Sequence, residues 1–203
     1  ILRDFDPDEE DIPSLDNNAD IPSLIGARYT KESRKGIMST SEYRNCFRTL
    51  NAEQKKVVLY NRKWCKQALE HISSDSPEPF PAYQIFLSGA GGTGKSHVIK
   101  MIRRDIIFFL KSKFSTIDNP LVLLTAPTGL AAFNINGITL HSALMLPVNN
   151  MNKVLSSPKK DLLQAKLCDL QLLVIDECSM IGSDTLELIH ERLCIAKGVP
   201  VND

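Results

Sequence analysis

Eight consecutive residues decide the fold class of this chain: Gly89, Ala90, Gly91, Gly92, Thr93, Gly94, Lys95 and Ser96. They match the phosphate-loop pattern of a glycine, four residues, and then Gly-Lys-Ser or Gly-Lys-Thr. The apolar residues 85–87 before the loop predict a buried strand, and the apolar residues from Val98 to Leu110 repeat at helical spacing. Strand, loop and helix in this order are the context that the pattern requires, so a glycine-rich turn that matches by chance is the less favoured interpretation.

Each part of the loop has a predicted task in holding nucleotide phosphates. Its glycines can adopt positive φ angles, which lets several backbone N–H groups point inward at phosphate oxygens. Lys95 is predicted to reach the β and γ phosphates, and Ser96 to offer its hydroxyl to Mg²⁺. The helix that begins at this point adds the positive end of its dipole. We therefore expect a nucleotide site that also uses Mg²⁺.

Two adjacent acids, Asp176 and Glu177, follow a second apolar run at residues 170–175. The run suits a central parallel strand. Ligands of open α/β sheets lie beyond the carboxyl ends of the strands, so we expect both acids to emerge beside the phosphate loop. Asp176 is predicted to hold Mg²⁺ through water, and Glu177 to polarise the water that attacks the γ phosphate. A solvated acidic pair after a strand is the alternative.

Two helices are predicted ahead of the loop, at residues 39–48 and 51–69. Asn51 as N-cap and Gln54 three residues later form a capping-box arrangement. The Gln54 amide also has the donor and acceptor geometry to pair with the N6 and N7 edge of adenine, which is the alternative role. We divide the chain into an acidic leader at 1–38, predicted to be disordered, a helical lead-in with its linker at 39–80, and a phosphate-loop domain at 81–203.

The stretch between the two nucleotide motifs contains a further predicted strand at residues 121–124. Pro127 and Thr128 follow it, and His141 lies farther along, beside Ser142. Hydroxyls and backbone N–H groups at a helix start can hold the phosphates of a nucleic-acid backbone. The alternative, which the residues by themselves favour, is a helix cap for Thr128 and a buried, hydrogen-bonded imidazole for His141.

Length and composition limit the size of the core and the class of protein. The 203 residues, 43% hydrophobic, suffice for one core of ordinary size, and no apolar run approaches the ~20 residues of a membrane span. The formal net charge is zero, but the charges are unevenly distributed along the chain. Residues 1–30 hold eight acids and two arginines, while the remainder carries a net charge of +6. That division suits a polyanion-binding domain with a tail that competes for its surface, but composition by itself favours the alternative of a solubilising linker. Five scattered cysteines indicate a reduced, intracellular protein.

The order of these motifs resembles the petite-integration-frequency helicases of superfamily 1B and the closely similar helicase region of Helitron transposons. The resemblance covers about residues 39–201, and its most specific part is the stretch 125–142. The N-terminal leader lies outside it, and so does the pentapeptide Asp-Ile-Pro-Ser-Leu, which occurs at 11–15 and again at 20–24. One departure is Cys178, where the family more usually has an aliphatic residue.

The resemblance implies an α/β RecA-like motor domain, a parallel sheet flanked by helices, in an ATP-dependent enzyme that moves 5′ to 3′ on single-stranded DNA. Carried over by position, Gln54 contacts adenine, Lys95 the phosphates, Ser96 and Asp176 magnesium, and Glu177 the attacking water. Pro127, Thr128 and His141 lie along the DNA path. Roles in repair, recombination and telomere maintenance, and a nuclear or mitochondrial location, are implied likewise.

The family continues beyond the equivalent of Asp203 into a γ-phosphate-sensing element and a second motor domain with arginines that complete the ATP site. We therefore expect a fragment that covers the first motor domain. A RecD-like recombination helicase and a transposon-derived remnant that binds nucleotide or DNA without turnover are the alternatives.

Overall fold

The computed structural model describes residues 37–74, 80–81, 83–114, 119–147 and 154–201. Residues 1–36 of the acidic leader, with the repeated pentapeptide, lie outside the described residues, as does most of the proline-rich linker. The described chain divides into two units, which we call the helical unit (residues 37–113) and the sheet unit (residues 114–201). The boundary near residue 81 between lead-in and phosphate-loop domain stays a prediction.

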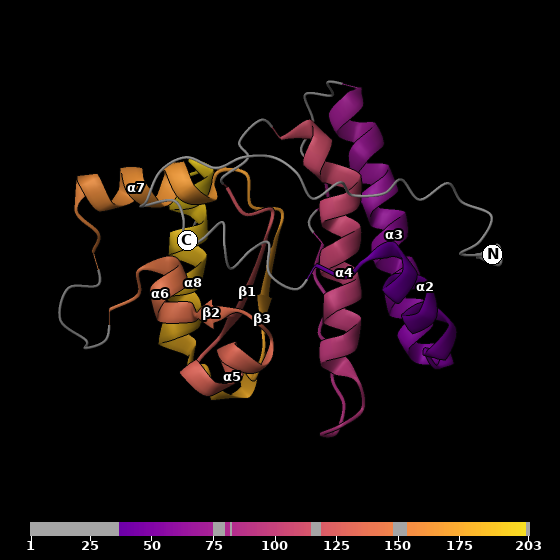
Figure 1. Ribbon diagram of the computed structural model, residues 1–203. Helices are drawn as coiled ribbons and strands as arrows, with labels where there is room; N and C mark the ends of the chain where they lie inside the picture. Colours follow the sequence, from indigo (N-terminus) through magenta and orange to yellow (C-terminus); the bar gives the residue numbers. More distant parts are fainter. Residues whose placement is uncertain (1–36, 75–79, 82, 115–118, 148–153, 202–203) are drawn as a thin grey trace. The chain divides into compact units, whose positions relative to one another are not determined.

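The helical unit contains α2 (Thr40–Thr49), α3 (Ala52–Ser73), α4 (Lys95–Leu110) and a short 3₁₀ helix, η1 (Lys111–Lys113). Figure 1 shows α3 and α4 lying side by side along most of their length. Capping boxes start the first two helices, from Ser39 and Glu42 in α2 and from Asn51 and Gln54 in α3. The predicted capping role of Asn51 and Gln54 is therefore confirmed.

The core of the helical unit follows from the helical spacing of its apolar residues. On α4 the predicted apolar positions include the buried side chains Val98, Met101, Ile102, Ile106 and Leu110. On α3 the buried apolar positions are Val58, Cys65 and Ala68, which recur every three to seven residues and so share one face of the helix. Packing of these two faces orients α4, and with it the loop that precedes the helix.

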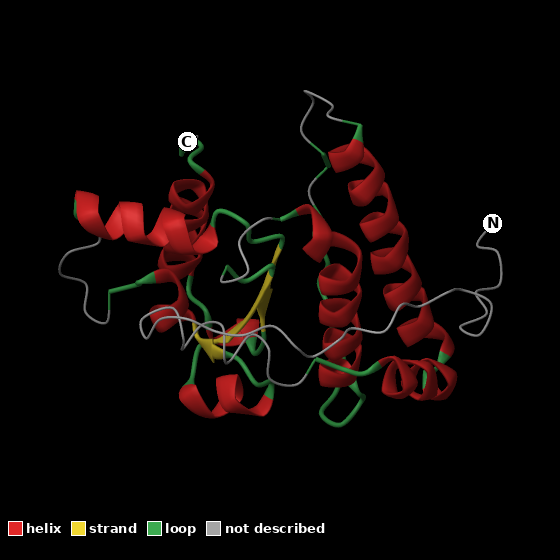
Figure 2. Cartoon of the chain, turned by 45° about the horizontal axis from the view of Figure 1, so that its top comes forward, coloured by secondary structure: helices red, strands yellow, loops and turns green. Residues whose placement is uncertain are grey.

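The sheet unit contains three parallel strands in the order β2-β1-β3, with β1 at Val122–Ala126, β2 at Ile138–Thr139 and β3 at Leu172–Ile175. Its helices are α5 (Gly129–Asn134), α6 (Leu140–Leu144), α7 (Ser157–Leu167), η2 (Cys178–Met180) and α8 (Ser183–Lys197). Figure 2 distinguishes the strands of this unit from its helices. The chain is therefore an α/β protein with a parallel sheet flanked by helices, as expected.

The core of the sheet unit lies where α6, α7 and α8 meet. Its buried members include Leu123, Leu140, Leu144, Leu163, Leu167 and Ile189. A glycine is required at position 137, because a Cβ there would collide with the carbonyl group of Leu124 in β1. That close approach lets the chain enter β2 directly beside β1.

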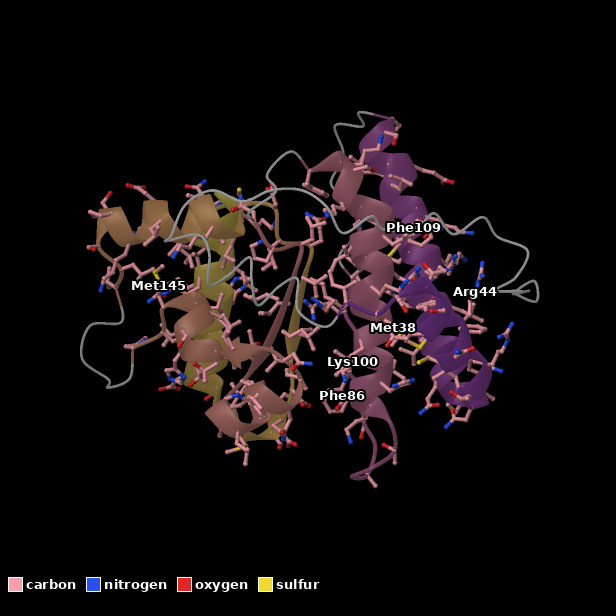
Figure 3. The ribbon with its side chains drawn as sticks, in the orientation of Figure 1. Met38, Arg44, Phe86, Lys100, Phe109 and Met145 are labelled. Carbon is pink, nitrogen blue, oxygen red and sulfur yellow. The ribbon has the colours of Figure 1, made fainter. Side chains whose placement is uncertain are left out.

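Two strand expectations need correction. Residues 83–90 form no strand; Ile85 is exposed, and Phe86 is 80% exposed. Figure 3 labels Phe86 in this segment. A strand exists only through hydrogen bonds to a neighbouring segment, and all three strands of the described chain belong to the sheet unit. The run 170–175 does form β3, but in the described sheet β1 is central and β3 pairs on one side only.

Among the described helices none combines the length and the apolar character needed to cross a bilayer.

Candidate nucleotide site

The phosphate loop has the backbone geometry that its glycines predict. Gly92 and Gly94 have φ angles of +75° and +83°, which are unfavourable for residues with a Cβ. Gly94 is the N-cap of α4, so Lys95 and Ser96 occupy the first two helical positions. The unpaired N–H groups of this first turn and the positive end of the helix dipole therefore face an anion that approaches the loop.

Hydrogen bonds within the loop hold its turn closed. The Thr93 hydroxyl donates to the Ala90 carbonyl at 2.8 Å. The Lys95 ammonium donates to the carbonyl oxygens of Gly89 and Ala90, at 2.7 and 2.9 Å. Lys95 therefore lies along the loop, and its charge is held close to the backbone groups that would surround a phosphate.

Gln54 joins the loop to the start of α3. Its Oε1 accepts a hydrogen bond from the Asn51 N–H at 3.0 Å, and its Nε2 donates to the carbonyl oxygen of Thr93 at 2.9 Å. A Cβ on Gly94 would lie 2.8 Å from the same Nε2. The sequence predicts a cap or an adenine contact for Gln54, but it does not predict this third role, a direct hydrogen bond to the phosphate loop. The capping-box pattern was the available signal, because it orients the Gln54 amide at the helix start.

Farther along α4, the arginines are engaged in the core of the helical unit. Arg103 and Arg104 are almost fully buried. Arg104 donates to the Thr40 hydroxyl at 3.1 Å, and its guanidinium lies 4.4 Å from the ring centroid of Tyr43. Arg104 therefore ties α4 to α2.

The carboxylate of Asp105 is the centre of this buried network. Its oxygens accept from the Tyr43 hydroxyl at 2.8 Å and from Arg62 at 3.5 Å, and Arg104 lies 3.7 Å away. Burial, reinforced by the negative charge of Asp105, raises the pKa of Tyr43 well above its ordinary range, so the phenol remains a donor. Three helices are joined through one carboxylate ten residues beyond Lys95.

The two acids lie in the sheet unit, directly after β3. The Asp176 N–H donates to the carbonyl oxygen of Thr125 at 2.8 Å, and the Asp176 Oδ1 accepts from the Glu177 N–H at 3.0 Å. Glu177 has a φ angle of +51°, an uncommon conformation for a residue with a Cβ. The Glu177 side chain is exposed.

Strand register places the predicted residues of the sheet unit at one edge. Ala126 in β1 pairs with Thr139 in β2, and Thr125 in β1 pairs with Ile175 in β3. The three strands are parallel and end at the same level. The segments that leave their carboxyl ends therefore begin at one edge of the sheet, and these segments contain Asp176, Thr128 and His141. The phosphate loop belongs to the helical unit, so its expected proximity to Asp176 and Glu177 stays a prediction.

Thr128 and His141 differ in how they are held. The Thr128 hydroxyl accepts from the Ala131 N–H at 3.2 Å and caps α5, as the alternative interpretation expected. His141 is partly exposed in the first turn of α6, so the expectation of a buried imidazole is wrong. The cap of α6 is Thr139, whose hydroxyl accepts from the Ser142 N–H at 3.3 Å. Pro127 is partly buried in the turn between β1 and α5.

Comparison with known proteins gives the family. The model of the PIF1-like helicase family matches residues 49–196, which is well over half of the chain. The chain belongs to the PIF1-like helicase family. The match includes Gln54, the phosphate loop, both acids and the stretch from Pro127 to His141, so every predicted site residue lies within the family region.

Similar curated proteins carry matching names. The chain is 36% identical over 178 residues to the ATP-dependent DNA helicase PIF1 of Candida albicans, a match that covers 85% of the chain and 16% of that protein. It is 36% identical over 123 residues to the ATP-dependent DNA helicase PIF1 of Emericella nidulans, covering 57% of the chain and 16% of that protein. With the ATP-dependent DNA helicase RRM3 of Saccharomyces cerevisiae it shares 33% identity over 125 residues, 59% of the chain and 16% of that protein.

The chain thus spans about a sixth of the length of these relatives. No solved structure matches it significantly.

Proposed function

We propose that this chain is the ATP-binding part of the first motor domain of an ATP-dependent DNA helicase that moves 5′ to 3′ on single-stranded DNA. The observation that carries the proposal is the phosphate loop, with two glycines at positive φ and Lys95 at the N-terminus of α4. The relatives support ATP as the nucleotide, since each is named an ATP-dependent DNA helicase.

In the proposed site, the loop residues Gly89 to Ser96 bind the ATP phosphates. Lys95 exchanges its bonds to the Gly89 and Ala90 carbonyls for bonds to phosphate oxygens. Gln54 contacts adenine with its side-chain amide, which also bonds to the Asn51 N–H and the Thr93 carbonyl. Glu177 orients the attacking water, and its strained backbone is consistent with a functional position.

Magnesium is the metal that the family implies, and the donors fit it. The Ser96 hydroxyl and the Asp176 carboxylate are hard oxygen ligands, which Mg²⁺ prefers. Ser96 is exposed at the start of α4, and Asp176 keeps Oδ2 free of the bond that its Oδ1 accepts from the Glu177 N–H. The bound ion would neutralise charge on the phosphates.

Single-stranded DNA is the proposed polymer ligand, along the carboxyl edge of the sheet at Pro127, Thr128 and His141. The exposed start of α5 offers N–H groups to a phosphate, and the partly exposed His141 follows the neighbouring strand. Roles in repair, recombination and telomere maintenance, with a nuclear or mitochondrial location, belong to the same proposal. A RecD-like enzyme and a transposon-derived remnant without turnover remain the competing candidates.

The test is nucleotide binding by the purified chain, measured with a fluorescent ATP analogue with and without Mg²⁺. Lys95→Ala should abolish binding or reduce it at least about a hundredfold, since the phosphates lose their main cation. Asp176→Ala should leave a residual affinity that no longer responds to Mg²⁺. Equal affinities of wild type and Lys95→Ala would refute the assignment.

Turnover of the same chain should be low. An arginine supplied to the transition state is worth about 10³ to 10⁵ in turnover, and the family's arginines lie in its second motor domain. Steady-state ATPase assays with and without single-stranded DNA should show weak hydrolysis and little stimulation, and no strand separation is expected. Processive 5′ to 3′ unwinding by the 203-residue chain would contradict this expectation.

A further inference from the structure

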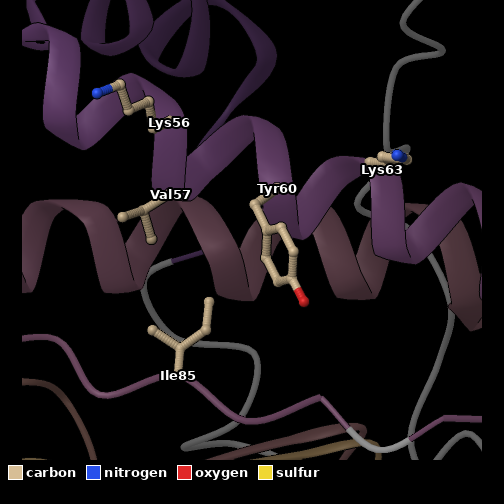
Figure 4. Close-up of a pocket in the computed structure, with 5 residues that line it drawn as sticks. All are labelled: Lys56, Val57, Tyr60, Lys63 and Ile85. Carbon is tan, nitrogen blue, oxygen red and sulfur yellow. The ribbon is translucent and has the colours of Figure 1, made fainter. Parts of the chain in front are cut away.

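A groove in the helical unit lies outside all the residues assigned so far. It runs between α3 and the segment before the phosphate loop and has a volume of about 510 Å³. Its lining consists of Lys56, Val57, Tyr60, Lys63 and Ile85. Figure 4 shows Val57 and Tyr60 projecting from α3 toward Ile85, with Lys56 and Lys63 on the turns to either side.

The ring of Tyr60 is held from one side. It stacks on Tyr83 with the centroids 6.0 Å apart and the planes at 18°, and Tyr83 in turn contacts Trp64 at 5.1 Å. Tyr60 nevertheless remains 55% exposed. A ring that is supported on one face and open to solvent on the other needs little ordering before a planar ligand stacks on it.

The charges at the groove favour an anionic ligand. Lys56, Tyr60 and Lys63 are spaced by four and three residues and so share one face of α3. Over seven residues the helix rises about 10.5 Å, so the two lysines leave α3 on either side of Tyr60 along the helix axis, and their flexible side chains can reach phosphates next to a stacked base. The lining contains no acid. Among the described residues Lys56 is paired with the exposed Glu53 at 2.8 Å, a bond that costs little to exchange.

The helical unit as a whole is also positively charged, with 13 basic and six acidic residues between 37 and 113. An aromatic platform flanked by lysines on a basic surface is the arrangement by which proteins bind single-stranded nucleic acid without base specificity. We propose that this groove is a second contact for single-stranded DNA, in which one base stacks on Tyr60 and the flanking phosphates meet Lys56 and Lys63. The identity of the ligand rests on the proposed function, but the groove is a binding site separate from the carboxyl edge of the sheet.

The experiment measures binding of fluorescein-labelled dT20 by anisotropy, over a series of salt concentrations, with wild type and groove variants. Tyr60→Ala should weaken binding at least about fivefold, the lower end of the effect of removing a stacking residue, while Tyr60→Phe should retain it. The double variant Lys56→Gln/Lys63→Gln should reduce the slope of log K against log salt by about 1.4, or 0.7 for each lost phosphate contact. Lys111→Gln/Lys113→Gln removes two exposed lysines of the same unit that do not line the groove, and should change both quantities less.

A second readout locates the oligonucleotide. Trp64 is the only tryptophan of the chain, and it touches Tyr83 behind Tyr60. Saturating dT20 should therefore quench its fluorescence in wild type and Tyr60→Phe, and much less in Tyr60→Ala. Because Tyr60 is more than half exposed, we expect Tyr60→Ala to fold, which circular dichroism checks.

The outcomes separate the groove from the proposed function. If Thr128→Val or His141→Ala weakens dT20 binding but Tyr60→Ala does not, the groove inference is overturned and the proposed function stands. If Tyr60→Ala weakens ATP binding and leaves dT20 binding unchanged, the groove is a nucleotide-base site and the inference is again overturned. A wild-type chain that binds no dT20 in any nucleotide state would refute both.

Discussion

The side-chain amide of Gln54 is hydrogen-bonded to the carbonyl oxygen of Thr93, at 2.9 Å across 39 residues of sequence. The bond ties the first turn of α3 to the turn that precedes α4. The other end of the same amide completes a capping box, so both ends of the side chain are engaged, each with one further hydrogen or lone pair. Base recognition at Gln54 would therefore act on a side chain that also holds the phosphate loop.

The first prediction separates the roles of Gln54 by means of a matched pair of variants. Gln54→Ala removes the loop contact and the bond that the Gln54 side chain accepts in the capping box, whereas Asn51→Ala removes only the bond that the Asn51 side chain accepts there. Both should destabilise the chain by about 1 kcal/mol, the usual cost of a lost cap. Only Gln54→Ala should lower nucleotide affinity, as measured by titration calorimetry with ATP and with CTP.

The base dependence then decides between two functions. A larger loss for ATP than for CTP indicates an adenine contact, whereas equal losses indicate that Gln54 acts only by positioning the loop. Unchanged affinity for both nucleotides, with lowered thermal stability, would reduce Gln54 to a helix cap.

A second prediction concerns the conformation of the loop. Gly94→Ala places a Cβ at a φ of +83° and only 2.8 Å from the Gln54 Nε2, so both strain and a collision follow. The left-handed conformation alone costs an alanine about 1–2 kcal/mol. We expect a loss of nucleotide affinity of about tenfold or more. Gly91→Ala is the control, because its Cβ would meet nothing within 4 Å; equal losses in the two variants would show that the loop is not sensitive to this geometry.

A third prediction tests the buried network of the helical unit. Asp105→Ala leaves Arg62 and Arg104 buried without their carboxylate, which should lower the free energy of unfolding by about 3–5 kcal/mol in urea titrations. Tyr43→Phe removes one hydrogen bond to a charged group and should cost about 1.5–3 kcal/mol. Glu53→Ala breaks an exposed ion pair with Lys56 and should cost less than about 1 kcal/mol. A similar small loss in all three would mean that the network contributes little.

The fourth prediction concerns the acidic leader, whose charge is known from the sequence alone. Residues 1–30 carry a net charge of −6 and the remainder +6, so the leader should weaken binding of single-stranded DNA by screening basic surface. Deleting residues 1–30 should strengthen binding at 0.1 M salt and have little effect at 1 M, where the Debye length falls from ~10 to ~3 Å. Replacing the eight acids by their amides should strengthen binding at low salt as the deletion does. A deletion that leaves the low-salt affinity unchanged would show that the leader is only a solubilising linker.

Several features could be predicted because they depend on residues that are neighbours in sequence. The phosphate loop is one, since its conformation follows from closely spaced glycines and a helix start. The capping box of Asn51 and Gln54 and the strands β1 and β3 are others, because caps act within one turn and long apolar runs favour buried strands. The family itself could be recognised for the same reason, from contiguous motifs in a fixed order.

Tertiary structure decided what depends on distant partners. Residues 85–87 have the composition of a strand, yet a strand is stabilised by hydrogen bonds to a neighbouring strand. The described residues of the helical unit contain no strand with which they could pair. The contacts of Asp105 with Arg62 of α3 and Tyr43 of α2 could not be inferred, because a buried charge is tolerated only where packing supplies its partners. The bond from Gln54 to Thr93 required the packing of α3 against α4, since local sequence specifies the cap but not what the free end of the amide will meet.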